Sequence, residues 1–403
     1  MRNKIEWILE NKVLIAGIIL SSLLLTSLAA DFAYSAGTYS ISSSGRIAMG
    51  WLHTEGTQIV DDFGSVFSLQ GANILGYDSN SHSQSDYAKM AGWGFNTVRL
   101  PIVWQYIEPQ PGVFNSQYLD NFISRDLRWA EANGLHVVVD MHQWYWSPVF
   151  TFDATTGSGF PRWACSGYPN TQQGYQQAVT DFFLNKGPNG TTASPTNPSM
   201  QDRYMTMWKY VASKFANESV VAGYDLFNEP LNGRYMPPPQ LTANLSFQSI
   251  TDIYFSFHDK LASEIRKVDA NHILFYELYG PYISPENLPV QAEALNDSNI
   301  VASFHFYHFR SSYNGDINWL NGMFNTWWWS SMKNLNIPIW VGEFGAFTED
   351  TNSGVWARDT LNIFSLHGLG WTWWAYGKSD TDTFCLLHAD GTERREWLQY
   401  LAS

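Results

Sequence analysis

The chain has 403 residues, of which 45% are hydrophobic and 15% charged, and its formal net charge is −14. This length fits one large catalytic domain, and the apolar content is sufficient for a large core, which argues against a largely disordered chain. Nucleic-acid binding needs clustered Lys and Arg side chains to neutralise phosphates, so the acidic balance and the 23 scattered basic residues argue against such a partner.

The first predicted element is an export segment. Three basic residues precede an apolar-to-small run from Val13 to Ala30. The run is long for the core of a signal peptide and just long enough to span a bilayer, and basic residues before it place the rest of the chain outside. We therefore predict a signal peptide or membrane anchor over residues 1–35. The protein would be extracellular, either secreted or tethered to the outer face of the membrane by this segment.

After an irregular lead-in from Ser35 to Gly64, strand-like apolar runs alternate with helix-like stretches. Eight continuous apolar strands, each followed by a helix, predict a parallel sheet closed into a barrel. We therefore predict one α/β domain, a (β/α)8 TIM barrel that forms the catalytic domain over residues 36–403. The strand candidates are Val66–Asn73, Phe95–Leu100, Leu135–Met141, Ala222–Asn228, His272–Glu277, Ile300–Phe304, Ile337–Gly342 and Leu369–Trp374.

Helices and long insertions are predicted between these strands. Gln117–Asn133 and Asp252–Val268 have apolar residues at a helical period. Two long insertions, from Gln143 to about Ser199 and from Leu231 to Leu245, follow strand C-termini and should overhang the active face. We expect the first to form a wall of a substrate cleft, with packing of its rings against the barrel as the alternative. Its aromatic residues are Trp144, Tyr145, Trp146, Phe150, Phe152, Phe160 and Trp163.

The chain has two cysteines, Cys165 and Cys385. Each lies in a loop on the predicted active face, and the chain is predicted to be exported. We therefore expect a disulfide between them, with two free thiols as the alternative, since sequence does not give the geometry that a disulfide requires.

Two glutamates each close an apolar run that is typical of a buried parallel strand: Glu229 and Glu343. A carboxylate is costly to bury unless it is hydrogen-bonded or paired, and the C-terminal ends of barrel strands carry the chemistry of barrel enzymes. Structural ion pairs would explain either glutamate alone. Convergence of several further side chains on one rim favours an active site. These are Arg99, His142, Asn228, His305, Tyr307 and Trp374.

The chain resembles glycoside hydrolase family 5 in the order of its site motifs, and the resemblance covers nearly all of the predicted barrel. These motifs are Arg, His, Asn-Glu-Pro, His-x-Tyr, Glu and Trp. The resemblance implies that Glu229 is the acid/base and Glu343 the nucleophile, with Arg99 and Tyr307 positioning the nucleophile. Trp373 is the alternative to Trp374 in the sugar-binding subsite. The resemblance implies that this subsite is lined by His142, Asn228, His305 and Trp374.

Physical chemistry supports these roles independently. A retaining mechanism needs one protonated and one ionised carboxyl about 5 Å apart. Glu343 would stay ionised with Arg99 close by, because a neighbouring cation favours the charged form. Glu229, expected to lack such a partner and to lie against apolar walls, would have a raised pKa and begin as the acid. Asn228 can donate to the sugar hydroxyl next to the reacting carbon.

The resemblance leaves several substrates open, because members of the family hydrolyse cellulose, mannans, mixed-linkage glucans or the bond that joins an oligosaccharide to ceramide. Segments such as Asp140–Gln143 and Gly159–Trp163 resemble the endoglycoceramidase branch. That branch carries a β-sandwich domain after the barrel, whereas this chain stops at Ser403, and Trp144 stands where an acidic residue is common. We therefore predict a retaining endo-β-glycosidase acting on β-glucan-type polysaccharide. A glycolipid hydrolase or a β-mannanase is the alternative.

Other chemistries fit less well. His305 and His308 would point to opposite faces of a strand, and no His-Glu-x-x-His helix is present, so we predict no metal and no cofactor. The expected partner is a β-linked glycan or glycoconjugate substrate, contact with a membrane is expected only through the N-terminal segment, and the protein is predicted to be a monomer. A non-catalytic carbohydrate-binding protein is the alternative from another class. Such a protein would use the 19 Trp, 21 Tyr and 25 Phe of the chain as sugar platforms, but it would not need two strand-end glutamates.

Overall fold

The computed structural model describes residues 40–41, 47–78, 81–152, 156–231, 238–243, 245–279, 290–307, 313–347, 352–380 and 384–402. Residues 49–403 form one compact unit, and residues 1–48 are grouped separately. In the latter group, β1 (Ser40–Ile41) pairs antiparallel with β2 (Ile47–Ala48). The predicted signal peptide or anchor lies outside the described residues. Among the helices of the described ranges, none is both long and apolar enough to cross a membrane.

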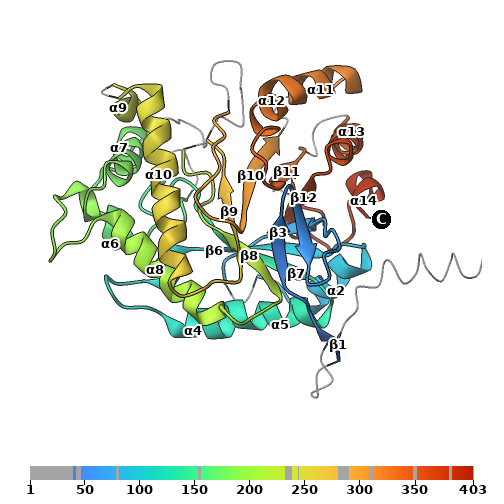
Figure 1. Ribbon diagram of the computed structural model, residues 1–403, viewed down its shortest axis with the longest axis horizontal. Coiled ribbons are helices and arrows are strands. Elements are labelled where there is room, and N and C mark those ends of the chain that lie inside the picture. Colours follow the sequence, from blue (N-terminus) through green and yellow to red (C-terminus); the bar gives the residue numbers. More distant parts are fainter. Residues whose placement is uncertain are drawn as a thin grey trace, which may run out of the picture. The chain divides into compact units, whose positions relative to one another are not determined.

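The unit that begins at Met49 is built around a closed barrel of eight strands, in which every neighbouring pair is parallel (Figure 1). All eight predicted strands are present, so the predicted TIM barrel is confirmed. The strands are almost entirely buried, because side chains fill the barrel on one face and helices cover the other. In chain order they are β5 (Gln70–Ile74), β6 (Thr97–Ile102), β7 (His136–Met141), β8 (Val221–Asp225), β9 (Ile273–Glu277), β10 (Ile300–Tyr307), β11 (Ile339–Gly345) and β12 (Gly370–Tyr376).

Helices follow the strands and cover the barrel, and local capping explains where two of them begin. Ser199 and Ser246 each accept a hydrogen bond from a backbone N–H of the first turn, so the helices that follow them begin there. The predicted helix from Asp252 therefore starts earlier, at Phe247. The predicted helix over Gln117–Asn133 is interrupted by a π-helical turn. The helices are α2 (Gln84–Gly92), α3 (Trp104–Ile107), α4 (Ser116–Tyr118), η1 (Leu119–Ile123), α5 (Ser124–Ala132), α8 (Met200–Phe215), α10 (Phe247–Arg266), α11 (Ile317–Phe324), η4 (Asn325–Trp329), α12 (Ser330–Met332), α13 (Ser353–Leu366) and α14 (Arg395–Leu401).

The predicted irregular lead-in up to Gly64 is wrong in part. Within it, β3 (Leu52–Glu55) pairs antiparallel with β4 (Gln58–Asp61). The hairpin turn uses Gly56 at φ 58°, a conformation that glycine adopts without strain. Val66, predicted to begin the first barrel strand, instead forms a bridge with Val60 of this hairpin.

The two insertions contain helices of their own. The first holds α6 (Arg162–Cys165), α7 (Gln172–Phe183) and the 3-10 turn η2 (Pro188–Gly190). The second holds α9 (Pro239–Thr242), and most of its remaining residues lie outside the described ranges.

Most aromatic rings of the first insertion pack that insertion onto the barrel. Trp146 is buried and stacks on Phe160 with 4.3 Å between ring centroids. Trp163 is partly buried, donates its indole N–H to the backbone oxygen of Glu108 and lies under Arg203. Tyr145 and Phe150 are buried as well, whereas Trp144 is 39% exposed. The buried rings therefore pack the insertion against the barrel, which was the alternative to a cleft wall. Trp144 is exposed enough to contact a substrate.

The predicted disulfide is wrong, because Cys165 and Cys385 are not bonded to each other. The sulfur of Cys165 interacts with Ser147, and burial raises the pKa of this thiol to about 12. Cys385 packs against Gly377 just after β12, where a Cβ on that glycine would lie 3.2 Å from the sulfur. Each sulfur is thus enclosed by different residues.

Candidate active site

The eight predicted site residues come together at the C-terminal end of the barrel. His142 directly follows β7, and Asn228 and Glu229 follow β8. The parallel arrangement places these strand ends on one rim, as in other barrel enzymes. The remaining five lie within the strands themselves: Arg99 on β6, His305 and Tyr307 on β10, Glu343 on β11 and Trp374 on β12.

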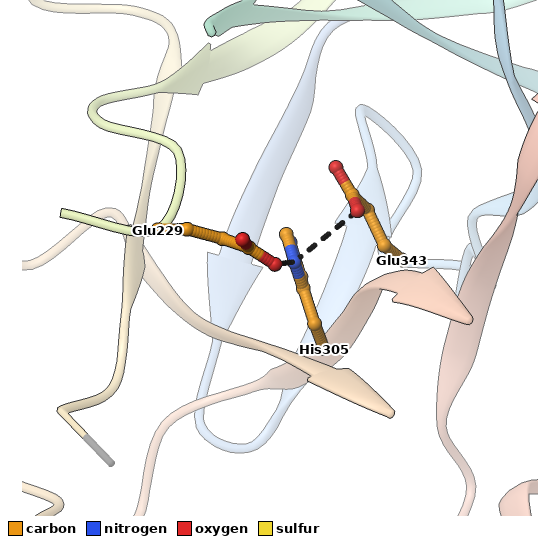
Figure 2. A group of neighbouring side chains, drawn as sticks. All are labelled: Glu229, His305 and Glu343. Carbon is orange, nitrogen blue, oxygen red and sulfur yellow. Dashed lines mark hydrogen bonds and ion pairs between the residues drawn. The ribbon is translucent and has the colours of Figure 1, made fainter. Parts of the chain in front are cut away.

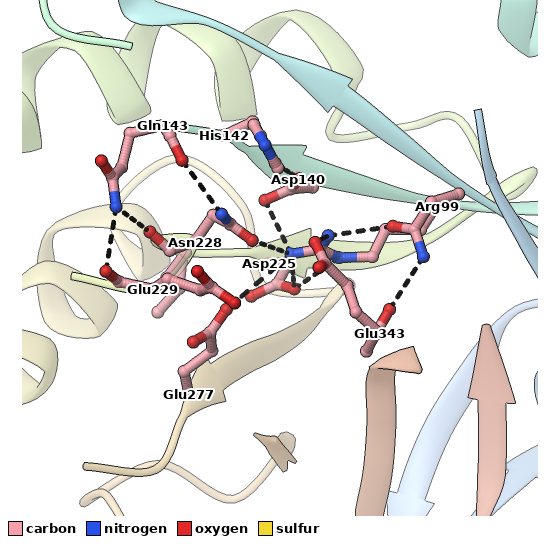
Figure 3. A network of polar contacts seen from close by, with 12 residues as sticks. Arg99, Asp140, His142, Gln143, Asp225, Asn228, Glu229, Glu277 and Glu343 are labelled. Atoms are coloured by element: carbon pink, nitrogen blue, oxygen red, sulfur yellow. Dashed lines mark hydrogen bonds and ion pairs between the residues drawn. The ribbon is translucent and has the colours of Figure 1, made fainter. Parts of the chain in front are cut away.

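Arg99 is the centre of the polar network, and its side chain is fully buried (Figure 3). Its Nη1 donates to Glu343 Oε1 at 2.6 Å, and its Nη2 donates to Asn228 Oδ1 at 2.9 Å. A buried guanidinium is tolerated only where it is paired and hydrogen-bonded, and here every nitrogen has an acceptor. The other acceptors are Asn73 Oδ1 and Asp225 Oδ2, each at 2.9 Å, and Asp140 Oδ1 forms an ion pair with Nη2 at 3.0 Å.

His305 lies between the two predicted catalytic glutamates (Figure 2). Its Nδ1 is 2.7 Å from Glu229 Oε1 and 3.3 Å from Glu343 Oε2. Tyr307 donates its hydroxyl to Glu343 Oε2 at 2.7 Å. Potential ligand atoms of Glu229, His305 and Glu343 all lie within 4.8 Å of one another, so a carboxyl oxygen of each glutamate lies within that distance of the other. The expectation that Glu229 has no ionisable partner is therefore wrong, because His305 is its partner.

The backbone at Glu229 is held in an unusual conformation, with φ 44°. A residue other than glycine rarely adopts this region, and such strain persists only where neighbours enforce it. Gln143 enforces it here, because its Nε2 donates to the backbone oxygens of both Asn228 and Glu229, at 3.0 and 2.9 Å. The Asn228 side chain returns a hydrogen bond to the Gln143 backbone oxygen at 3.1 Å.

Burial dominates the proton affinities of the site. It raises the pKa of Glu229 to about 7, although the hydrogen bond from His305 acts in the opposite direction. Burial likewise raises the pKa of Asp140 to about 8 and that of Asp225 to about 7 against the attraction of Arg99. Burial alone would lower the pKa of His305, but the surrounding carboxylates raise it well above its ordinary value. The site therefore holds protons at neutral pH.

His142 and Trp374 form a stacked pair beside this network, with ring centroids 5.2 Å apart and planes 8° apart. Burial lowers the pKa of His142 to about 3, so the imidazole is neutral, and its Nδ1 lies 2.8 Å from Asp140 Oδ2. Trp374 is half-buried, whereas Trp373 is fully buried and packs on Phe344. The structure thus places Trp374 on the site and Trp373 in the core.

Sequence reasoning missed Glu277, the last residue of β9. Its side chain is fully buried, and its Oε1 lies 3.2 Å from His305 Nε2 and 3.9 Å from Arg99 Nη2. The signal was present, since Glu277 is a third glutamate that closes an apolar run. The Arg99 partners Asn73, Asp140 and Asp225 were missed as well, because each reads as an ordinary polar residue within a strand.

Within the described ranges, Glu229, His305 and Glu343 are the side chains that could hold a metal ion, since their ligand atoms converge. The Arg99 guanidinium, 2.6 Å from Glu343, already supplies positive charge at that carboxylate. His305 is likewise close to carboxylates through both ring nitrogens. A cation would have to compete with Arg99 and displace the protons of His305, so the arrangement suits acid–base chemistry better than metal binding.

Comparison with known proteins identifies a family for the chain. The family model for cellulase (glycosyl hydrolase family 5) matches residues 60–380. The chain is 25% identical to an endoglycoceramidase from Cyanea nozakii, over 64% of this chain and 56% of the relative, so the match spans about half of that protein's length. It is 26% identical to endoglycoceramidase I from Rhodococcus hoagii, over 83% of this chain and 69% of the relative. It is 22% identical to an endoglucanase from Paenibacillus polymyxa, over 87% of this chain and 86% of the relative.

Among solved structures, endo-glycoceramidase II from Rhodococcus sp., in a complex with a five-membered iminocyclitol, has the same fold. It superimposes with a TM-score of 0.70 at 24% identity, over 85% of this chain and 80% of the other.

Proposed function

The chain belongs to glycosyl hydrolase family 5, and on that basis we propose that it hydrolyses β-glycosidic bonds by a retaining double displacement. The observation that carries the proposal is the short separation of Glu229 and Glu343, whose carboxyl oxygens lie within 4.8 Å of each other. Retaining enzymes place these carboxyls about 5 Å apart, whereas inverting enzymes leave roughly 6.5 to 9.5 Å for a water molecule.

Glu343 is the proposed nucleophile. Arg99 and Tyr307 donate to different oxygens of this carboxylate, at 2.6 and 2.7 Å, so they fix its plane. The positive charge of Arg99 also favours the ionised form that attack on the anomeric carbon requires. Attack by Glu343 breaks the glycosidic bond and forms a glycosyl ester on this side chain.

Glu229 is the proposed acid/base. Its side chain is 12% exposed, enough to reach a substrate, and its pKa of about 7 lets it hold a proton near neutral pH. It gives this proton to the leaving oxygen in the first step. In the second step the resulting carboxylate takes a proton from water, which then hydrolyses the ester.

His142, Asn228 and Trp374 are proposed to bind the sugar whose bond is broken. The Trp374 ring offers a flat apolar face to the sugar C–H groups. Asn228 accepts from Arg99 through Oδ1 and donates one N–H to Gln143, which orients its second N–H to donate to the sugar. A rigid donor of this kind strengthens its bond as charge develops in the transition state.

Two substrates have specific support. Similarity to endoglycoceramidase I of Rhodococcus hoagii supports the bond between an oligosaccharide and ceramide, and similarity to the Paenibacillus polymyxa endoglucanase supports a β-glucan. We place the glycolipid bond first, because the endoglycoceramidase match has the higher identity, 26% against 22%. This order reverses the prediction from the sequence, which placed a β-glucan first and a glycolipid second. The extracellular location remains a prediction that rests on residues 1–35.

The test of the reaction is a stereochemical one. Hydrolysis of 4-nitrophenyl β-lactoside followed by proton NMR in its first minutes should show the β-anomer as the first product. On an alkyl β-lactoside, whose leaving oxygen needs a proton, Glu229→Gln and Glu343→Gln should each lower kcat/KM at least about 10³-fold. Glu264→Gln is a matched control, because Glu264 pairs with Lys209 on the helical surface, away from the network. Inversion, or full activity in either site variant, contradicts the proposal.

The test of the substrate is a direct comparison of lactosylceramide in detergent, carboxymethylcellulose and glucomannan as substrates. Release of the intact oligosaccharide from the lipid, at a kcat/KM above that for the polysaccharides, supports the first candidate. Preference for carboxymethylcellulose supports the second. If the Glu229→Gln variant and the unmodified protein bind these sugars equally and neither hydrolyses them, the protein is a carbohydrate-binding protein without catalysis.

A further inference from the structure

Glu277 has no role in the mechanism above, yet it is the buried carboxyl that faces the second ring nitrogen of His305. Its side chain is fully buried, so it cannot touch a substrate, and its Oε1 lies 3.2 Å from His305 Nε2. We infer that Glu277 is a positioning residue that keeps His305 doubly protonated, so that the Nδ1–H of this imidazolium is directed at both Glu229 and Glu343.

The argument starts from the hydrogen-bonding capacity of histidine. A neutral imidazole has one donor nitrogen and one acceptor nitrogen, whereas both nitrogens donate in the imidazolium. In this site Nδ1 lies 2.7 Å from Glu229 Oε1 and Nε2 lies 3.2 Å from Glu277 Oε1. A neutral ring would point one lone pair at a carboxyl oxygen. With both nitrogens protonated, each N–H faces a carboxyl oxygen.

Other titratable groups also lie around His305. Glu229 and Glu343 approach Nδ1, and Tyr307, on the same strand, lies with its ring centroid 6.5 Å away. The charges of the more distant groups partly cancel one another, because Arg99 is paired with its carboxyl neighbours. These more distant groups are Arg99 on β6, Asp140 and His142 at β7 and Asp225 on β8. Removal of the Glu277 charge should therefore act mainly on the Nε2 proton.

The consequence for catalysis rests on the proposed glycosidase function. The imidazolium donates Nδ1–H to Oε1 of Glu229, which leaves Oε2 of that glutamate to carry the proton for the leaving group. Without the charge of Glu277, His305 would lose its Nε2 proton at lower pH, while Nδ1 keeps its proton. The charge of Glu277 also raises the pKa of Glu229, so without that charge Glu229 would lose its acid proton at a pH at which the unmodified enzyme still holds it.

The experiment uses Glu277→Gln, which keeps the shape of the side chain and removes its charge. In protein with ¹⁵N-labelled histidine, both ring nitrogens of His305 should be protonated at pH 7, with the signal assigned by loss in a His305→Asn variant. In Glu277→Gln the midpoint of this titration should fall by on the order of 1 to 3 pH units. The alkaline limb of kcat/KM on an alkyl β-lactoside, whose leaving oxygen needs the proton of the acid, should move to lower pH with it. Glu277→Asp, which keeps the charge, should restore part of the shift.

Asp269→Asn is the matched control. Asp269 is a buried carboxylate 2.6 Å from Nδ1 of His272, at the opposite end of β9, so its loss should change stability and leave the alkaline limb in place. Neutral His305 in the unmodified protein at pH 7 would overturn the inference, and this measurement does not depend on how any variant folds. An unchanged titration or an unchanged limb in folded Glu277→Gln would also overturn it. Loss of the Nε2 proton in Glu277→Gln, in a protein that hydrolyses no glycoside, would uphold the Glu277–His305 link and refute the proposed function.

Discussion

Adjacent tryptophans on β12 should respond to alanine substitution in opposite ways. Trp373 is fully buried, with ring centroids 5.1 Å from Phe344 and 5.0 Å from Trp397, and its indole N–H donates to the Phe384 backbone oxygen at 3.0 Å. Trp374 is half-buried and stacks on His142. Trp373→Ala should therefore reduce stability, and Trp374→Ala should reduce activity.

The size of each effect follows from what each ring contacts. Replacement of a buried tryptophan by alanine costs about 3 to 5 kcal/mol. For a unit of about 350 residues the unfolding entropy is about 0.75 kcal/mol/K, so Trp373→Ala should lower Tm by about 4 to 7 °C. A sugar covering about 100 Å² of the Trp374 ring would gain about 2.5 kcal/mol. Its loss corresponds to a decrease of about 70-fold in kcat/KM, with little change in Tm.

The assays are calorimetry for Tm and initial rates on an aryl β-lactoside, normalised to folded protein. Trp373→Ala should keep kcat/KM per folded molecule within a few-fold of the unmodified protein. The reasoning would be refuted if Trp374→Ala lost stability while its activity per folded molecule was unchanged. It would also fail if Trp373→Ala showed the larger catalytic defect, because that ring would then have to reach the sugar.

Three further predictions concern charge and thiols. Arg99→Lys keeps the charge, but the lysine cannot reach all the acceptors of the guanidinium. Urea denaturation should therefore show a free energy of unfolding that is lower by about 3 to 5 kcal/mol. The control Lys209→Arg, on the surface, should change it by less than about 1 kcal/mol. Because the pKa of Glu229 is raised to about 7, the acid loses its proton as pH rises through that value, and kcat/KM should fall above about pH 7; activity that stays constant to pH 9 would contradict this. Because Cys165 and Cys385 are buried and not bonded to each other, thiol titration without reductant should find no reactive thiol in the native protein and two after denaturation; none after denaturation would contradict the structure.

The barrel could be predicted because each strand is a continuous apolar run, which is what burial on both faces demands. The hairpin of β3 and β4 was missed because both of its strands, four residues each, carry exposed side chains and therefore look like a polar lead-in. The insertion rings were harder still. Trp144 and Trp146 are separated by one residue in an aromatic run, yet one is 39% exposed and the other is stacked on Phe160. Composition alone does not distinguish a ring that packs a loop from one that meets a substrate.

The site residues could be found for a different reason. A parallel barrel gathers the ends of distant strands on one rim, so Arg99 and Glu343, 244 positions apart, lie 2.6 Å from each other. Strand ends are visible in a sequence, and polar residues there stand out. The contacts that cross the rim are not visible in the same way. His305 was predicted to line a sugar subsite, and its position between Glu229, Glu277 and Glu343 depends on the angles at which three other strands approach it.

The location of protons is the property of this site that depends most on three-dimensional structure. Four carboxyl groups lie around Arg99, and a fifth, that of Glu229, contacts His305. Burial raises the pKa of Asp140, Asp225 and Glu229 against the attraction of nearby cations. Low-dielectric surroundings penalise every uncompensated charge, so a proton on His305 offsets the negative charge of the carboxyl groups around it. The roles of two similar glutamates are then separated by their partners. Glu343 accepts from Arg99, a permanent cation, and Glu229 accepts from His305, a group that can exchange its proton. An acid and a nucleophile of the same residue type can therefore lie less than 5 Å apart and still differ in charge.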